Sequence, residues 1–181
     1  MKVTRDIFPN TDIRIVSNGL LFDRVTDEQL QAMHDLYAGF DFSDYPPTHE
    51  LKAAIGARCR KHKVDHQFTP LIKEFFANHQ YNAPEKMQYN YEHCGSKHCH
   101  FLGNGKFAIC GMPILAEKFP EIADQLGYKA LPEDIIDLYD PNIDGFKINE
   151  MIHKPVASCA YCNDPVSFPW QGHYTKLYKP E

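Results

Sequence analysis

The chain has 181 residues and a net charge of −5, and 43% of its residues are hydrophobic, 13% aromatic and 24% charged. This composition is typical of a folded globular protein and excludes a disordered or fibrous chain, while the acidic balance argues against uniform attraction to nucleic acid or to an anionic membrane. Because no apolar run approaches the roughly 20 residues that span a bilayer, and the first residues lack the apolar segment of a secretory signal, we expect no membrane partner and a cytoplasmic location.

The first eighty residues alternate between strand-like and helix-like segments. The expected elements, in chain order, are a strand at 12–16, a helix after Thr26, a strand at 40–42, a helix after Thr48 and a strand at 64–68. Strands that alternate with helices are typical of parallel β/α units. This part of the sequence therefore predicts a parallel sheet with helical crossovers.

Local signals set the ends of the two predicted helices. Thr26 and Gln29 have the spacing of a capping box, which predicts a helix start at Thr26. We expect Pro46 and Pro47 to form a turn that a helix does not cross, so that Thr48 caps the second helix. Cys59 lies on the apolar face of that second helix, and we interpret it as a buried structural thiol.

From about Tyr81 the β/α rhythm stops, and tyrosine, histidine and cysteine crowd together. Asn104-Gly105 between two short apolar runs predicts a type I′ hairpin, with Cys99 and Cys110 near the open ends of its two strands. The remaining expected elements are helices at 112–119 and 121–126, mostly connecting structure at 131–141, a short helix at 148–153, and a loop that carries Cys159 and Cys162.

The cysteines of the second half carry the strongest chemical signal. Their pattern is Cys94-x4-Cys99-x10-Cys110, then 48 residues, then Cys159-x2-Cys162. Thiolates are soft ligands, and four of them satisfy either zinc or a [4Fe–4S] cluster. Because disulfides are rare in a reducing compartment, clustered cysteines in a chain without a secretory signal favour a metal site.

The spacing alone leaves the ligand set and the metal open. One site needs four ligands and the sequence offers five, so one thiol stands outside the first coordination sphere. Cys94, Cys99 and Cys110 form the compact set, while Cys159 and Cys162 share or compete for the remaining position. Three histidines beside the first two cysteines are alternative ligands or hydrogen-bond donors to sulfur, namely His93, His98 and His100.

Taken in order, these segments resemble the second half of a radical S-adenosylmethionine enzyme. Ile13 to Gly19 resembles a barrel strand of that family that ends in a Ser-Asn-Gly turn, and Gly39 to Pro46 resembles the next strand, which ends in a serine. Cys94, Cys99 and Gly105-x4-Cys110 resemble the opening of the auxiliary-cluster region called a SPASM or Twitch domain.

The resemblance implies an α/β chain in two parts. Residues 1–82 would form a partial parallel β/α barrel (an incomplete TIM-like barrel), and residues 83–181 a small hairpin-plus-helix metal-binding domain. It implies an auxiliary [4Fe–4S] cluster, which relays electrons or positions substrate, with zinc as the alternative metal. It also implies that Ser17, Asn18 and Ser43 lie on the S-adenosylmethionine side at the barrel mouth.

The chain departs from the family at one decisive point. The Cys-x3-Cys-x2-Cys motif, which binds the cluster that cleaves S-adenosylmethionine, is absent from the sequence. Three β/α units also leave an unpaired edge at the first strand. We therefore expect the C-terminal portion or a partner of a radical S-adenosylmethionine enzyme, with the missing N-terminal half or another subunit as its partner, and an incomplete enzyme on its own. A degenerate relative of the family is the remaining alternative.

Two other classes of function remain open on the sequence. One is a zinc-stabilised four-cysteine module that mediates protein interaction, and the other is an electron carrier with its own exposed cluster. The sequence identifies neither the substrate nor the oligomeric state.

Overall fold

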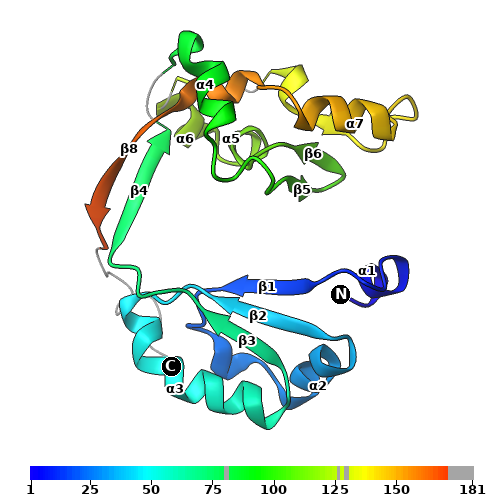
Figure 1. Cartoon of the computed structure of the whole chain (residues 1–181), viewed down its shortest axis with the longest axis vertical. Coiled ribbons are helices and arrows are strands. Elements are labelled where there is room, and N and C mark those ends of the chain that lie inside the picture. The colour runs from blue at the N-terminus through cyan, green and yellow to red at the C-terminus, as the bar shows by residue number, and fades with distance from the viewer. Residues whose placement is uncertain (80–81, 126, 129–130, 171–181) are drawn as a thin grey trace. The chain divides into compact units, whose positions relative to one another are not determined.

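The computed structural model describes residues 1–79, 82–125, 127–128 and 131–170 (Figure 1). The chain forms two compact units, one of residues 1–75 and 168–181 and the other of residues 76–167. We call these unit 1 and unit 2. The domain boundary between residues 82 and 83 that the sequence suggested stays a prediction.

Unit 1 is built around a three-stranded parallel sheet in the order β1-β2-β3. Its strands are β1 (Ile13–Ser17), β2 (Ala38–Phe42) and β3 (Asp65–Phe68), and its helices are α1 (Lys2–Ile7), η1 (Phe22–Arg24), α2 (Asp27–Asp35) and α3 (Pro46–Lys61). Helices α2 and α3 connect successive strands and lie on the same face of the sheet (Figure 1). The predicted strands and the parallel β/α connections are confirmed.

The start of α2 is as the sequence predicts. The Thr26 side chain accepts a hydrogen bond from the Gln29 backbone N–H, and the Gln29 side chain accepts one from the Thr26 N–H. The capping box therefore satisfies donors at the helix start that would otherwise lack partners.

The predicted start of the second helix is wrong. Helix α3 begins at Pro46 with Tyr45 as its N-cap, and both prolines lie in its first turn. Proline is tolerated there because the first N–H groups of a helix have no intrahelical partner. Thr48 does not cap the helix; its buried hydroxyl donates to the Asn18 carbonyl at 2.5 Å.

An aromatic cluster forms the core of unit 1. The Phe42 ring is completely buried and lies 5.0–5.4 Å from the ring centres of three other phenylalanines, namely Phe22, Phe40 and Phe68. Aliphatic side chains of α2 and α3 complete this core, together with the fully buried Cys59. Burial raises the pKa of Cys59 to about 11, so it behaves as the structural thiol that the sequence suggested.

Unit 2 contains a second small sheet and several short helices. Its elements are η2 (Pro84–Lys86), α4 (Met87–Glu92), β5 (Phe101–Gly103), β6 (Lys106–Ala108), α5 (Met112–Lys118), α6 (Pro120–Gln125), η3 (Pro132–Asp134), β7 (Ile136–Asp137), α7 (Gly145–Ile152) and η4 (Ala157–Tyr161). Strands β4 (Glu74–His79) and β8 (Cys162–Pro169) form a separate two-stranded sheet, and the division between the units crosses both strands. The chain is thus a mixed α/β protein with small sheets.

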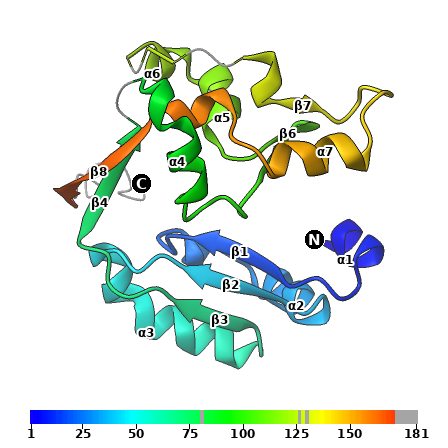
Figure 2. The ribbon, with the colours of Figure 1, turned by 45° about the horizontal axis from the view of Figure 1, so that its top comes forward.

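The predicted hairpin is confirmed. Strands β5 and β6 pair antiparallel, and both turn residues have positive φ, 53° at Asn104 and 74° at Gly105, as a type I′ turn requires. A Cβ atom at Gly105 would also collide with the Tyr139 ring, so both the positive φ and the close contact favour glycine at this position. Strand β7 adds to the free side of β6, as Figure 2 shows.

The segment 131–141 is mostly connecting structure, as expected, and holds the short elements η3 and β7. Two other predictions for the second half need correction. Helix α7 begins three residues before the predicted start because the Asp144 side chain caps it at the Lys147 N–H. The cysteine pair lies not in a loop but at the 3₁₀ turn η4 and the first residue of β8. The helices on either side of Phe119 are confirmed, and Leu126 lies outside the described residues.

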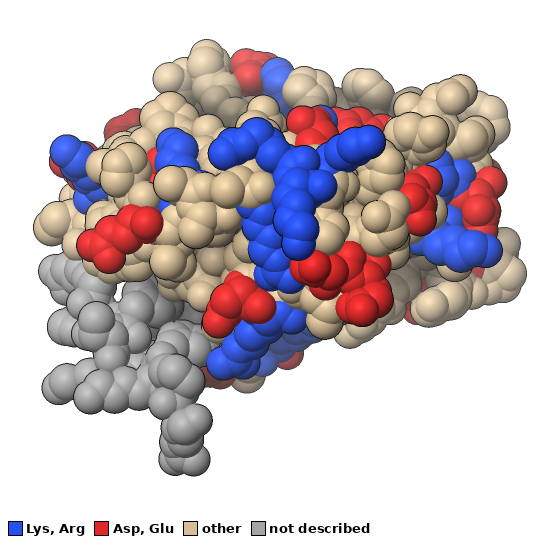
Figure 3. All heavy atoms as spheres, turned by 90° about the horizontal axis from the view of Figure 1, so that it is seen from below, with Lys and Arg blue, Asp and Glu red and all other residues tan. Residues whose placement is uncertain are grey.

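Charged side chains of both signs lie next to one another on the face shown in Figure 3. Arg58 and Lys61 of α3 both pair with Asp27 of α2, at 2.9 and 3.5 Å. One carboxylate therefore offsets part of the positive charge at the end of α3, where Arg60 also lies. None of the helices in the described part of the chain has the length and apolar character needed to cross a bilayer.

Replacing Phe42 by alanine tests the core of unit 1. Truncating a completely buried phenylalanine should lower the free energy of unfolding by about 3–5 kcal/mol, because it removes apolar contacts and leaves a cavity. Denaturant unfolding measures this. The matched control is Val16→Ala, since Val16 is 73% exposed and its loss should change stability by less than about 0.5 kcal/mol. Equal effects of the two substitutions would contradict this core.

Candidate functional site

Three segments of unit 2 bring four cysteines together. Cys94 follows α4, Cys110 follows β6, Cys159 lies in η4, and Cys162 opens β8. All four are partly buried. The Asn90 side chain of α4 donates to the carbonyls of both Cys159 and Cys162, at 2.9 Å for Cys159, and thereby holds the returning chain against this helix.

The thiols of these four residues lie close enough for their charges to interact. Burial raises the pKa of Cys159 to about 11 and that of Cys162 to about 12, and Cys94 and Cys110 add to both shifts. Burial also raises the pKa of Cys110, and the Cys94 charge adds to it. These mutual effects indicate that the four thiols lie in the same region of unit 2.

Cys99 stands apart from this group. It is exposed, its backbone N–H donates to the Ser96 carbonyl at 2.8 Å, and it is not among the thiols whose charges act on Cys110, Cys159 and Cys162. Of the five predicted ligands, the structure therefore brings together Cys94, Cys110, Cys159 and Cys162.

The four thiols are near one another without being in ligand positions. Among the described residues, no three His, Cys, Asp or Glu side chains are placed closely enough to hold a metal ion. The chemistry of the donor set nevertheless fits a tetrahedral metal or a cubane cluster, since both take four thiolates. Binding would have to draw the sulfur atoms inward and displace their protons.

The three neighbouring histidines have other contacts. His93 is exposed, stacks on the Tyr89 ring at 4.1 Å, and its Nδ1 lies 2.9 Å from the Tyr89 carbonyl. The His100 ring packs against Phe107, and its buried Nδ1 has no hydrogen-bond partner within the described part of the chain. His98 is exposed.

Two polar residues beside the cysteines, Ser158 and Asp134, were not among the predicted site residues. The Ser158 hydroxyl lies 3.9 Å from the Cys110 sulfur, and the buried Asp134 carboxylate accepts the Ser158 N–H at 3.2 Å. Asp134 lies in the acidic segment 131–141, whose sequence predicts mostly connecting structure. The sequence offered one indication of this turn: proline and acidic residues are common in the first turn of a helix, and Asp134 follows Pro132 by two positions.

The other group of predicted site residues lines a cavity in unit 1. Ser17, Asn18 and Ser43 follow or end β1 and β2, where parallel strands commonly present ligand-binding side chains. They surround a cavity of about 300 Å³, whose wall is completed by aromatic rings, namely Tyr45, Phe75 and Trp170. Tyr45 and Phe75 stack at 5.3 Å.

Local hydrogen bonds shape the polar side of this cavity. The Ser17 hydroxyl accepts from the Gly19 N–H and the Asn18 amide oxygen accepts from the Leu20 N–H, both at 3.1 Å. The Ser43 N–H donates to the Ser17 carbonyl at 2.9 Å. The turn after β1 is therefore preorganised, and hydroxyl and amide groups meet an aromatic wall there.

No family model, curated protein sequence or solved structure matches this chain. Functional conclusions therefore depend on these residues and their geometry.

Metal binding to the cysteine group should depend steeply on pH. In the metal-free protein the raised pKa values keep Cys159 and Cys162 protonated at pH 7, whereas metal ligation needs both as thiolates. All four ligands must lose a proton, and burial raises the pKa of Cys110 as well. The apparent affinity for Co²⁺ should therefore rise about tenfold per pH unit for each proton displaced, approaching about ten-thousandfold per unit between pH 6 and 8. Thiolate-to-cobalt absorption measures it.

The Cys59→Ser variant is the control for this titration, because Cys59 has a similarly raised pKa but lies in the core of unit 1. Its slope with pH should equal that of the unmodified chain. An affinity that does not change with pH would contradict ligation by these thiols.

Proposed function

We propose that this chain is the auxiliary-cluster part of a radical S-adenosylmethionine enzyme, in which unit 2 binds a [4Fe–4S] cluster. The observation that carries the proposal is the convergence of Cys94, Cys110, Cys159 and Cys162 from three separate segments. Free thiols distributed by chance would not share one region, whereas a cluster requires four together.

The choice of iron–sulfur over zinc rests on the resemblance of the chain to that family. Four thiolates suit either metal, so the donor set alone does not decide. The family resemblance of the hairpin with Cys110, and of the Ser-Asn-Gly turn after β1, favours iron–sulfur. A zinc-stabilised module that mediates protein contacts is the competing outcome of the experiment below.

In this proposal unit 1 is part of an incomplete β/α barrel. The sheet order leaves β1 at an edge, where a further strand could pair. Another polypeptide segment, either an N-terminal half or a separate subunit, would supply that strand and the Cys-x3-Cys-x2-Cys motif. The chain would work with it in the cytoplasm, and the auxiliary cluster would relay electrons or hold substrate.

The cavity at the strand ends belongs to the same proposal. Ser17, Asn18 and Ser43 would contact S-adenosylmethionine in the completed enzyme, and Tyr45 and Phe75 would offer a flat apolar surface to its adenine ring. The chain alone would not generate the 5′-deoxyadenosyl radical, because it lacks the motif that binds the cleaving cluster.

Anaerobic reconstitution with iron and sulfide tests the proposal. The protein should become brown, with broad visible absorption and four iron and four sulfide ions per chain. Cys110→Ser should abolish this absorption, while the matched Cys59→Ser variant should keep it, since Cys59 lies in the other unit. A colourless protein that carries one equivalent of zinc would show the interaction module instead.

A second pair of variants tests which thiols are ligands. Cys94→Ser should reduce the iron content to less than half, because the Cys94 charge acts on Cys110, Cys159 and Cys162. Cys99→Ser should leave the iron content unchanged, because Cys99 is exposed and outside this group. Iron analysis of the two variants prepared in parallel decides between them, and the reverse pattern would exchange their roles.

A further inference from the structure

We infer that Asp134 is a positioning residue that fixes the turn carrying Cys159 and lowers the reduction potential of the centre held there. The inference rests on the proposed function, because it concerns the same four-cysteine site. It assigns a role to a buried carboxylate that is not itself a ligand.

Asp134 is completely buried, and three donors from separate positions bond its two oxygens. Oδ2 accepts from the Tyr128 hydroxyl at 3.1 Å and from the Leu131 N–H at 3.0 Å. Oδ1 accepts from the Ser158 N–H at 3.2 Å. Surroundings made of three donors match an ionised carboxylate, because this group accepts hydrogen bonds and donates none.

Ser158 connects this carboxylate to the thiols. It directly precedes Cys159 in η4, and its hydroxyl lies 3.9 Å from the Cys110 sulfur. Asp134 thus holds the backbone of the turn from which Cys159 projects, while the Ser158 side chain reaches Cys110. A shift of this turn would move both sulfur atoms relative to each other.

The Asp134 charge also lies close to the thiols. Its Oδ1 is 3.2 Å from the backbone nitrogen of Ser158, the residue directly before Cys159, and the Ser158 hydroxyl is 3.9 Å from the Cys110 sulfur. The same charge, together with burial, raises the pKa of Tyr128. A group that opposes negative charge on these sulfur atoms also opposes the addition of an electron to a centre that they bind.

Burial makes this field effective. Charges in a protein interior are screened less than those at the surface, so a buried carboxylate beside the site acts more strongly than an exposed one would. Solvent exposure and net charge are among the factors that set iron–sulfur potentials. Burying a charge is costly, and an asparagine in its place would offer a single acceptor oxygen to donors that now bond both oxygens of the carboxylate.

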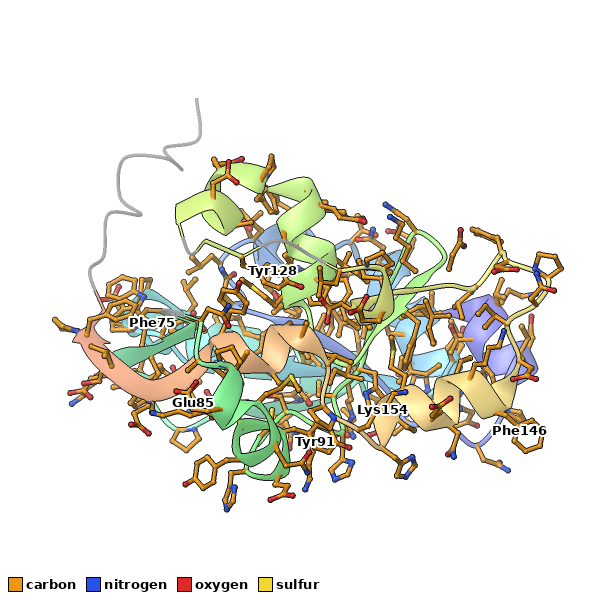
Figure 4. All side chains as sticks on the ribbon, turned by 90° about the horizontal axis from the view of Figure 1, so that it is seen from above. Phe75, Glu85, Tyr91, Tyr128, Phe146 and Lys154 are labelled. Carbon is orange, nitrogen blue, oxygen red and sulfur yellow. The ribbon has the colours of Figure 1, made fainter. Side chains whose placement is uncertain are left out.

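Two variants are compared: one removes the charge together with one of its two acceptor oxygens, and the other removes a single hydrogen bond and keeps the charge. Asp134→Asn removes the charge at nearly constant volume. Tyr128→Phe removes one donor and keeps the carboxylate, so its charge is less compensated. Tyr128, labelled in Figure 4, is itself 3% exposed, which makes the two substitutions comparable in burial.

The experiment is a potentiometric titration of the anaerobically reconstituted full chain, followed by electron paramagnetic resonance of the reduced cluster. Asp134→Asn should favour the reduced form by a factor of about ten or more, which is a rise of about 59 mV for one electron. Tyr128→Phe should shift the midpoint in the opposite direction. Thermal unfolding of each variant, measured alongside, separates a loss of stability from a change in potential.

Several results would overturn the inference. One is an Asp134→Asn variant that unfolds more easily but keeps the midpoint of the unmodified chain, since that is a structural role only. If this variant does not fold, Tyr128→Phe decides alone, and an unchanged or raised midpoint refutes the role of the charge. An unmodified chain that binds zinc and shows no reversible signal would overturn the proposed function as well, and the two failures are thereby distinct.

Discussion

The return of the chain from Val156 to Cys162 against helix α4 is the constraint on which the candidate site depends. Cys159 and Cys162 lie about fifty residues beyond the hairpin in sequence, and nothing local places them near Cys110. Backbone carbonyls of the turn accept hydrogen bonds instead, from the Asn90 side chain and from the Ala83 N–H, which reaches Ala160 at 2.9 Å. Apolar packing of Val156 and Met151 with Ile109 fixes the same turn from its other side. Without these contacts the four thiols would have no common location.

The two units meet different physical demands. Unit 1 buries an aromatic core between a parallel sheet and two helices, and its polar cavity lies at the ends of the strands, where backbone turns leave side chains exposed. Unit 2 has short helices, short strands and a small apolar core. Small cores supply limited stability, and metal ligation is a common way to supplement them. A bound centre would therefore contribute to folding of unit 2 as well as to function.

Local signals in the sequence predicted local structure well. The Thr26–Gln29 capping box and the Asn104-Gly105 turn each depend on backbone geometry within four residues, and both formed as expected. The start of α3 was missed because proline both interrupts helices and begins them, and only packing decides which. Strand β7 was missed because two residues paired to β6 leave almost no periodic pattern.

The sequence indicated some residues of the candidate site and missed others. It identified the cysteine cluster and the polar residues at the strand ends, because residue type and spacing are visible in a chain. It could not separate Cys94 from Cys99, since the difference between them is one of burial. Nor could it indicate Asp134, because a buried acid in a segment rich in Asp and Pro looks like a solvent-exposed connection until its donors are placed.

The central claim is that four cysteine sulfur atoms of unit 2 hold an iron–sulfur cluster. X-ray absorption at the iron edge of the anaerobically reconstituted protein tests it most directly. The account predicts a first shell of sulfur alone at about 2.3 Å, the usual length of a metal–thiolate bond, with iron–iron scattering beyond it. A first shell of nitrogen or oxygen, or iron without iron neighbours, would contradict it.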